Sequence, residues 1–358
     1  MKLLTLGDYR RAARAKLTPM AWRYFRAGAD AEVTLRDNVR AWRRWQILPR
    51  VLVDVSRIDV ATTVLGEPSS MPVMVAPTAY HRLAHPEGER ATMRAAAAAG
   101  VVACAATLAT TSLEECAQAG ARWFQLYVHR DLGLTREIVR RVEAAGYRAL
   151  AVTVDTPVLG RRLGDERLGF ALPPELDMPN LMAGLPATVD RASALAKYFA
   201  ERHAAFFSWK DLEALQRSTR IPIVLKGVMR ADDAARAVDH GVAALVVSNH
   251  GGRQLDGVPA TIDALEAVVA AVAGRCEVFV DGGVRWGTDV VRALALGARA
   301  VLLGRPILWG LAVDGEAGVR AVLELMRSEL LRAMALAGAR NVREIDRDLV
   351  RPRETMLR

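Results

Sequence analysis

One histidine of the chain has the neighbours that a general base needs. His250 lies in the run Ser248-Asn249-His250-Gly251-Gly252-Arg253, directly after an apolar segment. An isolated histidine is more often structural, but the glycines beside this one leave room for a ligand. Asp155 follows another apolar segment and is placed to orient the imidazole and stabilise its protonated form. We therefore predict that His250 is a catalytic base supported by Asp155.

Two arginines are candidates for holding a substrate carboxylate, because a guanidinium fork matches carboxylate geometry. They are Arg162, shortly after Asp155, and Arg253, three residues after His250. Tyr24 and Tyr127 offer hydroxyl groups to that carboxylate or to the substrate oxygen. The spacing around Tyr24 alone predicts a core residue, so Tyr24 contributes only if the N-terminal part of the chain folds over the site.

The sequence also predicts a phosphate site. Asp281-Gly282-Gly283-Val284-Arg285 and Gly304-Arg305 each follow an apolar segment. The glycines let backbone N–H groups approach an anion closely, and the arginines add charge-assisted hydrogen bonds. The alternative is that the glycines only end strands and the arginines lie at the surface.

Lys226 closes the apolar segment 222–225. A lysine at the end of a buried strand needs an anionic partner or a depressed pKa. A reduced flavin carries negative charge at its N1/O2 edge, and a fixed ammonium there favours reduction. A structural ion pair is the alternative role.

Eight short apolar segments, each followed by a helical stretch, must position these groups. Continuous apolar runs are typical of parallel strands buried on both faces, and the intervening helices suit βαβ crossovers. Eight such units predict an α/β fold, a closed (β/α)₈ TIM barrel whose active site lies at the carboxyl ends of the strands. The predicted strands are 73–76, 101–104, 123–127, 150–154, 221–225, 244–247, 277–280 and 300–303.

We expect one domain over 1–358. Residues 1–60 form a helical N-terminal extension, 61–315 the barrel with a long loop at about 156–220 over its mouth, and 316–358 C-terminal helices. Within the extension, Thr18-Pro19 is a helix start signal, and Asp30 begins a second helix that runs to about Trp45.

The composition is typical of a globular protein with one large core. The chain has 358 residues, 52% of them hydrophobic, which suffices for one large core. The net charge of +9 comes mostly from arginines that are interspersed with acids, so we expect no nucleic-acid partner but a field that attracts small anions. Three separated cysteines, no signal peptide and no apolar stretch of about 20 residues predict a cytoplasmic protein without a structural metal or a membrane anchor.

Together these motifs resemble the FMN-dependent L-2-hydroxy acid oxidases and dehydrogenases, which include glycolate oxidase, lactate oxidase and mandelate dehydrogenase. The resemblance runs from about Tyr9 to the C-terminal helix and is most specific at Val246–Asp256, where the chain reads VVSNHGGRQLD. Further matches are the runs FQLY at 124–127, TVDTP at 153–157, LGRR at 159–162 and DGGVR at 281–285.

The resemblance implies FMN as cofactor and His250, with Asp155, as the base that oxidises a 2-hydroxy acid to the 2-oxo acid. It places Tyr24, Tyr127, Arg162 and Arg253 on the substrate. It implies a homotetramer, with O₂ as the electron acceptor, or a quinone or another acceptor if the chain is a dehydrogenase. The cofactor-binding residues that it implies are Pro77, Thr78, Ala79, Gln125, Thr153, Lys226, Ser248, Asp281, Gly282, Gly283, Arg285, Gly304 and Arg305.

Three positions depart from the family pattern. Ala106 stands where many members have a serine or threonine that touches the flavin, and Leu108 stands where glycolate oxidases have a bulky aromatic residue. Tyr80 replaces an aliphatic residue. A pocket with Leu108 and Tyr80 favours lactate, longer aliphatic acids or an aryl acid such as mandelate over glycolate.

Two other hypotheses are weaker. The first is a different FMN- or phosphate-binding barrel, such as a nucleotide dehydrogenase or an isomerase. A nucleotide dehydrogenase needs a catalytic cysteine on a mouth loop, whereas Cys104 and Cys276 fall in predicted strands and Cys116 in a predicted helix. A basic binding protein would be colourless and would bind nucleic acid in a salt-sensitive way.

Overall fold

The computed structural model describes residues 2–182 and 203–353 and contains an eight-stranded parallel sheet that closes on itself. The sheet has the order β4-β11-β10-β9-β8-β7-β6-β5, and a parallel bridge from Val75 to Ala103 joins its two ends. The predicted TIM barrel is therefore confirmed. The strands are β4 (Val73–Val75), β5 (Cys104–Ala106), β6 (Trp123–Leu126), β7 (Ala149–Thr153), β8 (Ile223–Val228), β9 (Ala244–Val247), β10 (Glu277–Asp281) and β11 (Ala300–Leu303).

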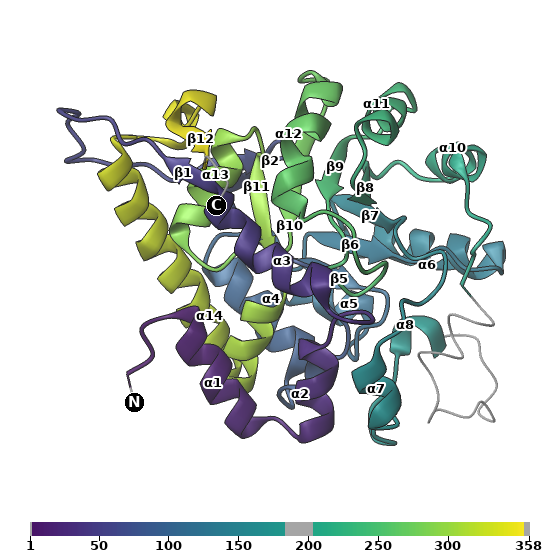
Figure 1. Ribbon diagram of the computed structural model, residues 1–358. Coiled ribbons are helices and arrows are strands. Elements are labelled where there is room, and N and C mark those ends of the chain that lie inside the picture. Colours follow the sequence, from purple (N-terminus) through teal and green to yellow (C-terminus); the bar gives the residue numbers. More distant parts are fainter. Residues whose placement is uncertain (1, 183–202, 354–358) are drawn as a thin grey trace.

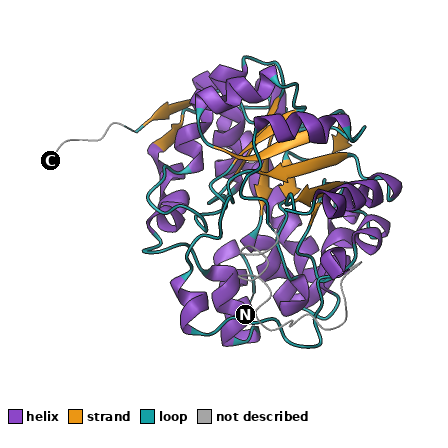
Figure 2. Ribbon diagram, turned by 90° about the vertical axis from the view of Figure 1, so that its right-hand side faces the viewer, coloured by secondary structure: helices purple, strands orange, loops and turns teal. Residues whose placement is uncertain are grey.

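The helices that alternate with the strands pack around the barrel, as Figures 1 and 2 show. The apolar runs placed β9 and β11 at their observed bounds, but the run at 101–104 precedes most of β5. Pairing with β6 begins only at Cys104. The helices are α4 (Gly88–Ala98), α5 (Leu113–Gln118), α6 (Leu132–Ala144), α7 (Leu163–Arg167), α8 (Pro179–Met182), α10 (Trp209–Arg217), α11 (Ala231–Asp239), α12 (Thr261–Val272), α13 (Gly287–Ala295) and α14 (Arg305–Ala337).

The N-terminal extension contains α1 (Leu6–Lys16), α2 (Pro19–Arg26) and α3 (Val33–Arg40). The Thr18 hydroxyl accepts a hydrogen bond from the Ala21 amide and caps α2, which confirms the predicted start. The prediction that Asp30 begins a helix is wrong: Asp30 has a φ of +42°, and α3 begins only at Val33. The Asp30 amide donates to the Arg161 carbonyl, so a contact with a distant loop outweighs the local capping signal.

The expectation of helix up to residue 60 is also wrong. After a 3₁₀ turn at Ala41–Arg44, the chain forms β1 (Trp45–Ile47), which pairs antiparallel with β12 (Val350–Pro352) near the C-terminus. Residues 48–60 form a loop. A hairpin of β2 (Thr62–Val64) and β3 (Glu67–Ser69) follows it, and Val64 packs into the barrel interior.

The barrel interior is filled with side chains. Trp123 and Phe279 meet edge to face there with ring centroids 5.4 Å apart, and Met74, Val224 and Val246 pack around them. A second and larger apolar cluster fills the space between the strands and the surrounding helices. No helix within residues 2–182 and 203–353 has the length and apolar character to span a membrane.

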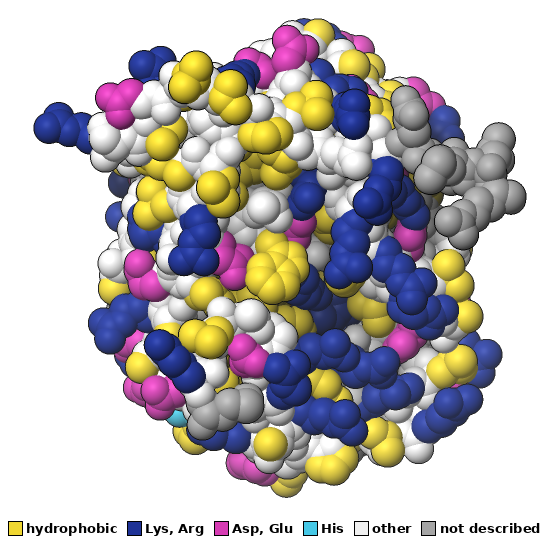
Figure 3. Space-filling view, turned by 60° about the vertical axis from the view of Figure 1, so that its left-hand side comes forward, with side chains coloured by type: hydrophobic (Ala, Val, Ile, Leu, Met, Phe, Trp, Pro, Cys, Tyr) yellow, Lys and Arg dark blue, Asp and Glu magenta, His cyan; other side chains and the backbone are white. Residues whose placement is uncertain are grey.

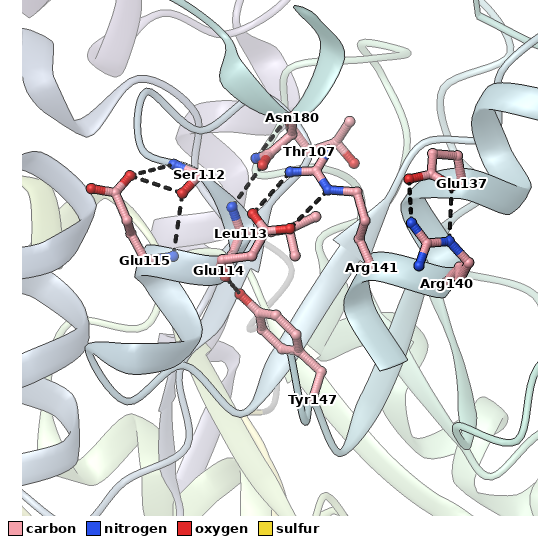
Figure 4. A network of polar contacts seen from close by, with 10 residues as sticks. All are labelled: Thr107, Ser112, Leu113, Glu114, Glu115, Glu137, Arg140, Arg141, Tyr147 and Asn180. Atoms are coloured by element: carbon pink, nitrogen blue, oxygen red, sulfur yellow. Dashed lines mark hydrogen bonds and ion pairs between the residues drawn. The ribbon is translucent and has the colours of Figure 1, made fainter. Parts of the chain in front are cut away.

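The described parts of the long 156–220 loop contain α7, α8 and α10. Figure 1 shows α2, α7 and α8 at one end of the molecule, and α2 and α7 contact each other. Figure 4 shows Asn180 of α8 turned toward the start of α5. Its side chain is fully buried, accepts from the Leu113 amide at 2.7 Å and donates to the carbonyl groups of Ala106 and Thr107. Asn180 therefore fastens this segment to the loop after β5.

We expect Asn180→Ala to loosen α8. The substitution leaves the buried Leu113 amide without its acceptor, and such a loss costs about 1–3 kcal/mol. Hydrogen exchange of the amides in 180–182 and of Leu113 should become faster, while exchange in the barrel strands stays unchanged. Asn341→Ala, which removes a capping amide on the far C-terminal segment, is the control. Unchanged exchange at Leu113 would contradict the assignment.

Candidate active site

A cavity of about 140 Å³, which opens to solvent, lies at the carboxyl ends of the barrel strands. All of the predicted site residues line this cavity except Asp155 and Ser248, which lie directly behind it. Figure 3 shows a hollowed face of the molecule with Lys and Arg side chains gathered around the hollow. Barrel enzymes use this end of the fold for catalysis.

His250 and Asp155 meet across two strand ends. The Nδ1 atom of His250 lies 2.9 Å from Oδ1 of Asp155, and Nε2 lies 3.5 Å from the Tyr127 hydroxyl. The carboxylate thus fixes one ring nitrogen and leaves the other toward the cavity. Asp155 sits close to β8 because Gly227 has no side chain: a Cβ there would lie 2.6 Å from that of Asp155.

The protonation of this pair depends on burial and on neighbouring charges. Burial lowers the pKa of His250 below its usual 6.5, and Asp155 offsets only part of that effect. Burial alone would raise the pKa of Asp155, but His250 and Lys226 outweigh burial and lower it. At neutral pH the pair is therefore a neutral imidazole beside a carboxylate, the state in which Nε2 accepts a proton.

The two predicted carboxylate-binding arginines face the same cavity. Arg162 precedes the first residue of α7 and is only 7% exposed. Arg253 donates from Nη1 to the carbonyl groups of Tyr24 and Ala27, and its guanidinium lies 5.0 Å from the centre of the Tyr24 ring. Burial lowers the pKa of Arg253 to about 10, so it stays charged at neutral pH.

The N-terminal extension does fold over the barrel mouth. Tyr24 is buried, belongs to the large apolar cluster and also lines the cavity, so the core role and the site role coincide. Arg305 fastens the extension there by donating to the carbonyl groups of Phe25, Ala27 and Gly251. These contacts could not be predicted from the sequence, because their acceptors are backbone carbonyl groups, which every residue type has.

Lys226 lies in β8, and its side chain is buried. Its ammonium donates to Ser248 Oγ at 2.9 Å and lies 3.3 Å from Oδ2 of Asp281. Burial lowers the pKa of Lys226, but Asp281 and Asp155 more than compensate and raise it, so the ammonium is charged. Lys226 therefore has a structural ion pair and lines the cavity as well.

The far end of the cavity has the shape of an anion site. Gly282 and Gly283 have φ values of +94° and +83°, and a Cβ at Gly283 would lie 1.8 Å from the Asn38 carbonyl oxygen. The first residue of α14 follows Gly304, so the positive end of that helix dipole lies here. Arg285 stacks over Trp309 at 5.0 Å, and burial lowers its pKa to about 10.

Smaller groups line the remaining walls. Gln125 donates to Thr153 Oγ1 at 3.0 Å, and Pro77, Thr78 and Ala79 form the wall after β4. Ala106 contributes only a methyl group, so the hydroxyl that many family members offer at this position is missing.

The expectation for Tyr80 is wrong. Leu108 lines the cavity, but Tyr80 does not. Tyr80 has a φ of +62° and is fully buried behind Tyr24, with the two ring centroids 5.4 Å apart. Phe170, which the sequence did not single out, stacks on Tyr24 with centroids 4.4 Å apart. Both residues therefore pack against Tyr24.

None of the three cysteines lines the cavity. Cys104 lies in β5 and Cys116 in α5, as predicted, whereas Cys276 lies one residue before β10 and not within it. A cysteine-dependent nucleotide dehydrogenase is therefore excluded for this cavity. Among the described residues, no group of His, Cys, Asp and Glu side chains is arranged to hold a metal ion.

Comparisons with known proteins agree with this architecture. The family model described as FMN-dependent dehydrogenase matches residues 13–352. L-lactate oxidase of Nostoc sp. is 51% identical over 352 residues, which cover 96% of each chain. Glycolate oxidase of Spinacia oleracea is 50% identical over 351 residues, covering 97% of this chain and 95% of that one. The structure of mandelate oxidase with (S)-4-hydroxymandelic acid superposes with a TM-score of 0.93 at 45% identity, covering 99% and 100% of the two chains.

Proposed function

The chain belongs to the FMN-dependent dehydrogenase family, and we propose that it oxidises an L-2-hydroxy acid with His250 as the base. It is an FMN-dependent 2-hydroxy acid oxidase, like the relatives described above. One observation carries the assignment of the base. His250 is held at Nδ1 by Asp155, which leaves Nε2 toward a cavity that Arg162 and Arg253 also line.

The residues of the cavity fit FMN. Backbone amides at Gly282 and Gly283, the start of α14 and the guanidiniums of Arg285 and Arg305 would take the phosphate. The buried Oδ1 of Asp281 has no hydrogen-bond partner in the described residues and would accept a ribityl hydroxyl. We assign the isoalloxazine to the remaining cofactor residues named above, with Lys226 as the nearby cation.

The chain's own groups divide the work of oxidation. FMN, when bound, supplies the two-electron acceptor. Arg162 and Arg253 hold the substrate carboxylate, and the hydroxyl groups of Tyr24 and Tyr127 donate to the carboxylate or to the substrate oxygen. His250 removes a proton at Nε2, either from the α-carbon or from the hydroxyl group, and Asp155 stabilises the imidazolium that forms.

The role of Asp155 predicts a pH effect. Proton abstraction needs a neutral His250, so kcat/KM should rise with pH through the lowered pKa of His250 and level off above it. Asp155→Asn removes a group that raises this pKa, so the acidic limb should move to lower pH. The plateau should fall at the same time, because the imidazolium loses its partner. A limb that stays in place or moves to higher pH would contradict the role of Asp155.

We assign a substrate with a side chain rather than glycolate. Leu108 leaves space where a bulky aromatic residue would fill the cavity, and this supports lactate, longer aliphatic acids or an aryl acid. The test is a panel of 2-hydroxy acids of both hands, each assayed for bleaching of the flavin and for peroxide. We expect the L (S) acids to bleach the flavin and O₂ to return as H₂O₂. Bleaching without peroxide would identify a dehydrogenase that uses a quinone or another acceptor, and no bleaching by any acid would overturn the proposal.

We make three further assignments. The length and strand pattern favour a single catalytic domain over 1–358, the separated cysteines favour a cytoplasmic location, and the family resemblance implies a homotetramer. Light scattering of the FMN-loaded protein tests the last of these against the chain mass of 38.9 kDa. A mass of about one chain would reject the homotetramer.

A further inference from the structure

A cluster of charges that includes Arg162 lies where α2 contacts α7. Asp165 is on α7, two residues after the first residue of that helix, and Arg162 precedes the helix directly. Arg23 of α2 packs against the neighbouring Gly164 so closely that a Cβ there would lie 1.8 Å from the Arg23 Nε atom. Neither Arg23 nor Asp165 was singled out by the sequence motifs.

Three polar atoms of this cluster are buried without hydrogen-bond partners in the part of the chain that the structure describes. They are Nε of Arg23, Nε of Arg162 and Oδ1 of Asp165. Within the described residues, no carboxylate lies within 4 Å of the guanidinium of Arg23 or of Arg162. Asp165 therefore forms no direct ion pair with these two arginines. Burial raises the pKa of Asp165, and the three nearby guanidiniums, led by that of Arg253, lower it in part. Asp165 is thus within electrostatic reach of all three.

The guanidinium groups near the substrate site carry more positive charge than one substrate carboxylate can neutralise. Arg162, Arg253 and Arg23 carry three positive charges, and a 2-hydroxy acid brings one carboxylate. The 2-oxo acid product carries the same carboxylate, so an unopposed cluster would hold product as firmly as substrate. Buried charges interact through a low effective dielectric, so one carboxylate a few ångströms away changes this balance substantially.

We propose that Asp165 limits the affinity of the carboxylate site, acting through Arg162 and Arg253 without touching substrate, and that Arg23 opposes it. The inference rests on the proposed function of the cavity. Asp165 reduces the positive potential at the two arginines, which favours product release. Arg23, which packs against Gly164 of α7, raises the same potential.

The two roles predict changes of opposite sign. Asp165→Asn keeps the shape of the side chain and removes its charge, so the FMN-loaded enzyme should bind pyruvate and benzoylformate about ten-fold more tightly. Arg23→Gln should weaken binding of both by a similar factor, and the double variant should return close to the wild type. Dissociation constants are measured by titrating the flavin absorbance. Pyruvamide, which has no carboxylate, should bind all four proteins equally.

A merely structural role gives a different pattern. Disturbed packing between α2 and α7 would weaken the binding of pyruvamide and of both acids in each variant, and that result would overturn the proposal. So would unchanged or weaker binding of pyruvate and benzoylformate by Asp165→Asn alone. Glu166→Gln, which removes an exposed charge from the same helix, is the matched control and should bind as the wild type does. A wild-type flavin spectrum that responds to neither acid would instead overturn the proposed function.

Discussion

Replacing His250 with glutamine is expected to leave FMN bound and to slow reduction of the flavin by substrate about 10²–10⁴-fold, the usual contribution of a general base. The imidazole contacts the carboxylate of Asp155 at Nδ1 and the hydroxyl of Tyr127 at Nε2, so the substitution removes the proton acceptor. Rapid mixing under anaerobic conditions, with bleaching of the yellow colour as the signal, measures the rate.

A second variant separates the loss of the base from strain in the backbone at residue 250. Its φ of +57° is left-handed, which costs most residues more than it costs asparagine. His250→Asn should therefore keep the local backbone and lose the same rate. His240→Gln, a histidine that stacks on Trp209 outside the cavity, should be reduced normally. Rapid bleaching in either His250 variant would reject histidine as the base.

Replacing Lys226 with methionine should have the largest effect on stability. The ammonium is buried between Asp281 and Ser248, and its removal leaves the Asp281 carboxylate uncompensated in the barrel. Breaking a buried pair in this way costs about 3–5 kcal/mol. The free energy of unfolding in urea should fall by that amount, and the protein should retain less FMN.

A double variant separates charge from packing. In Lys226→Met with Asp281→Asn, neither charge remains, so most of the lost free energy should return. Lys210→Met, at an exposed position of α10, should leave the unfolding midpoint unchanged. A loss below about 1 kcal/mol in the single variant would show that the pair is not important for stability, because surface pairs contribute that little.

The barrel was predictable because its strands are buried on both faces. Segments such as 244–247 and 300–303 consist of apolar residues alone, and the polar groups that follow them meet at one end of the fold by geometry. The position of the cavity at the strand ends follows from the same geometry. His250, Lys226 and Arg253 were placed there by their order along the chain.

The misplaced elements depend on contacts between distant segments. The start of α3 was placed too early because the Asp30 amide bonds to the carbonyl of Arg161, a partner that local sequence does not reveal. Tyr80 turned away from the cavity because its backbone is left-handed and its ring packs behind Tyr24. No sequence motif marks Asp165, because the arginines that act on it lie on three separate segments of the chain.

The pairing of β1 with β12 has a consequence for synthesis. Ile47 leaves the ribosome about 300 residues before its partner Val350, which at 5–20 residues per second is a delay of about 15–60 seconds. During that interval β1 has no pairing partner. A polypeptide that stops before residue 350 would therefore leave the backbone groups of residues 45–47 unpaired.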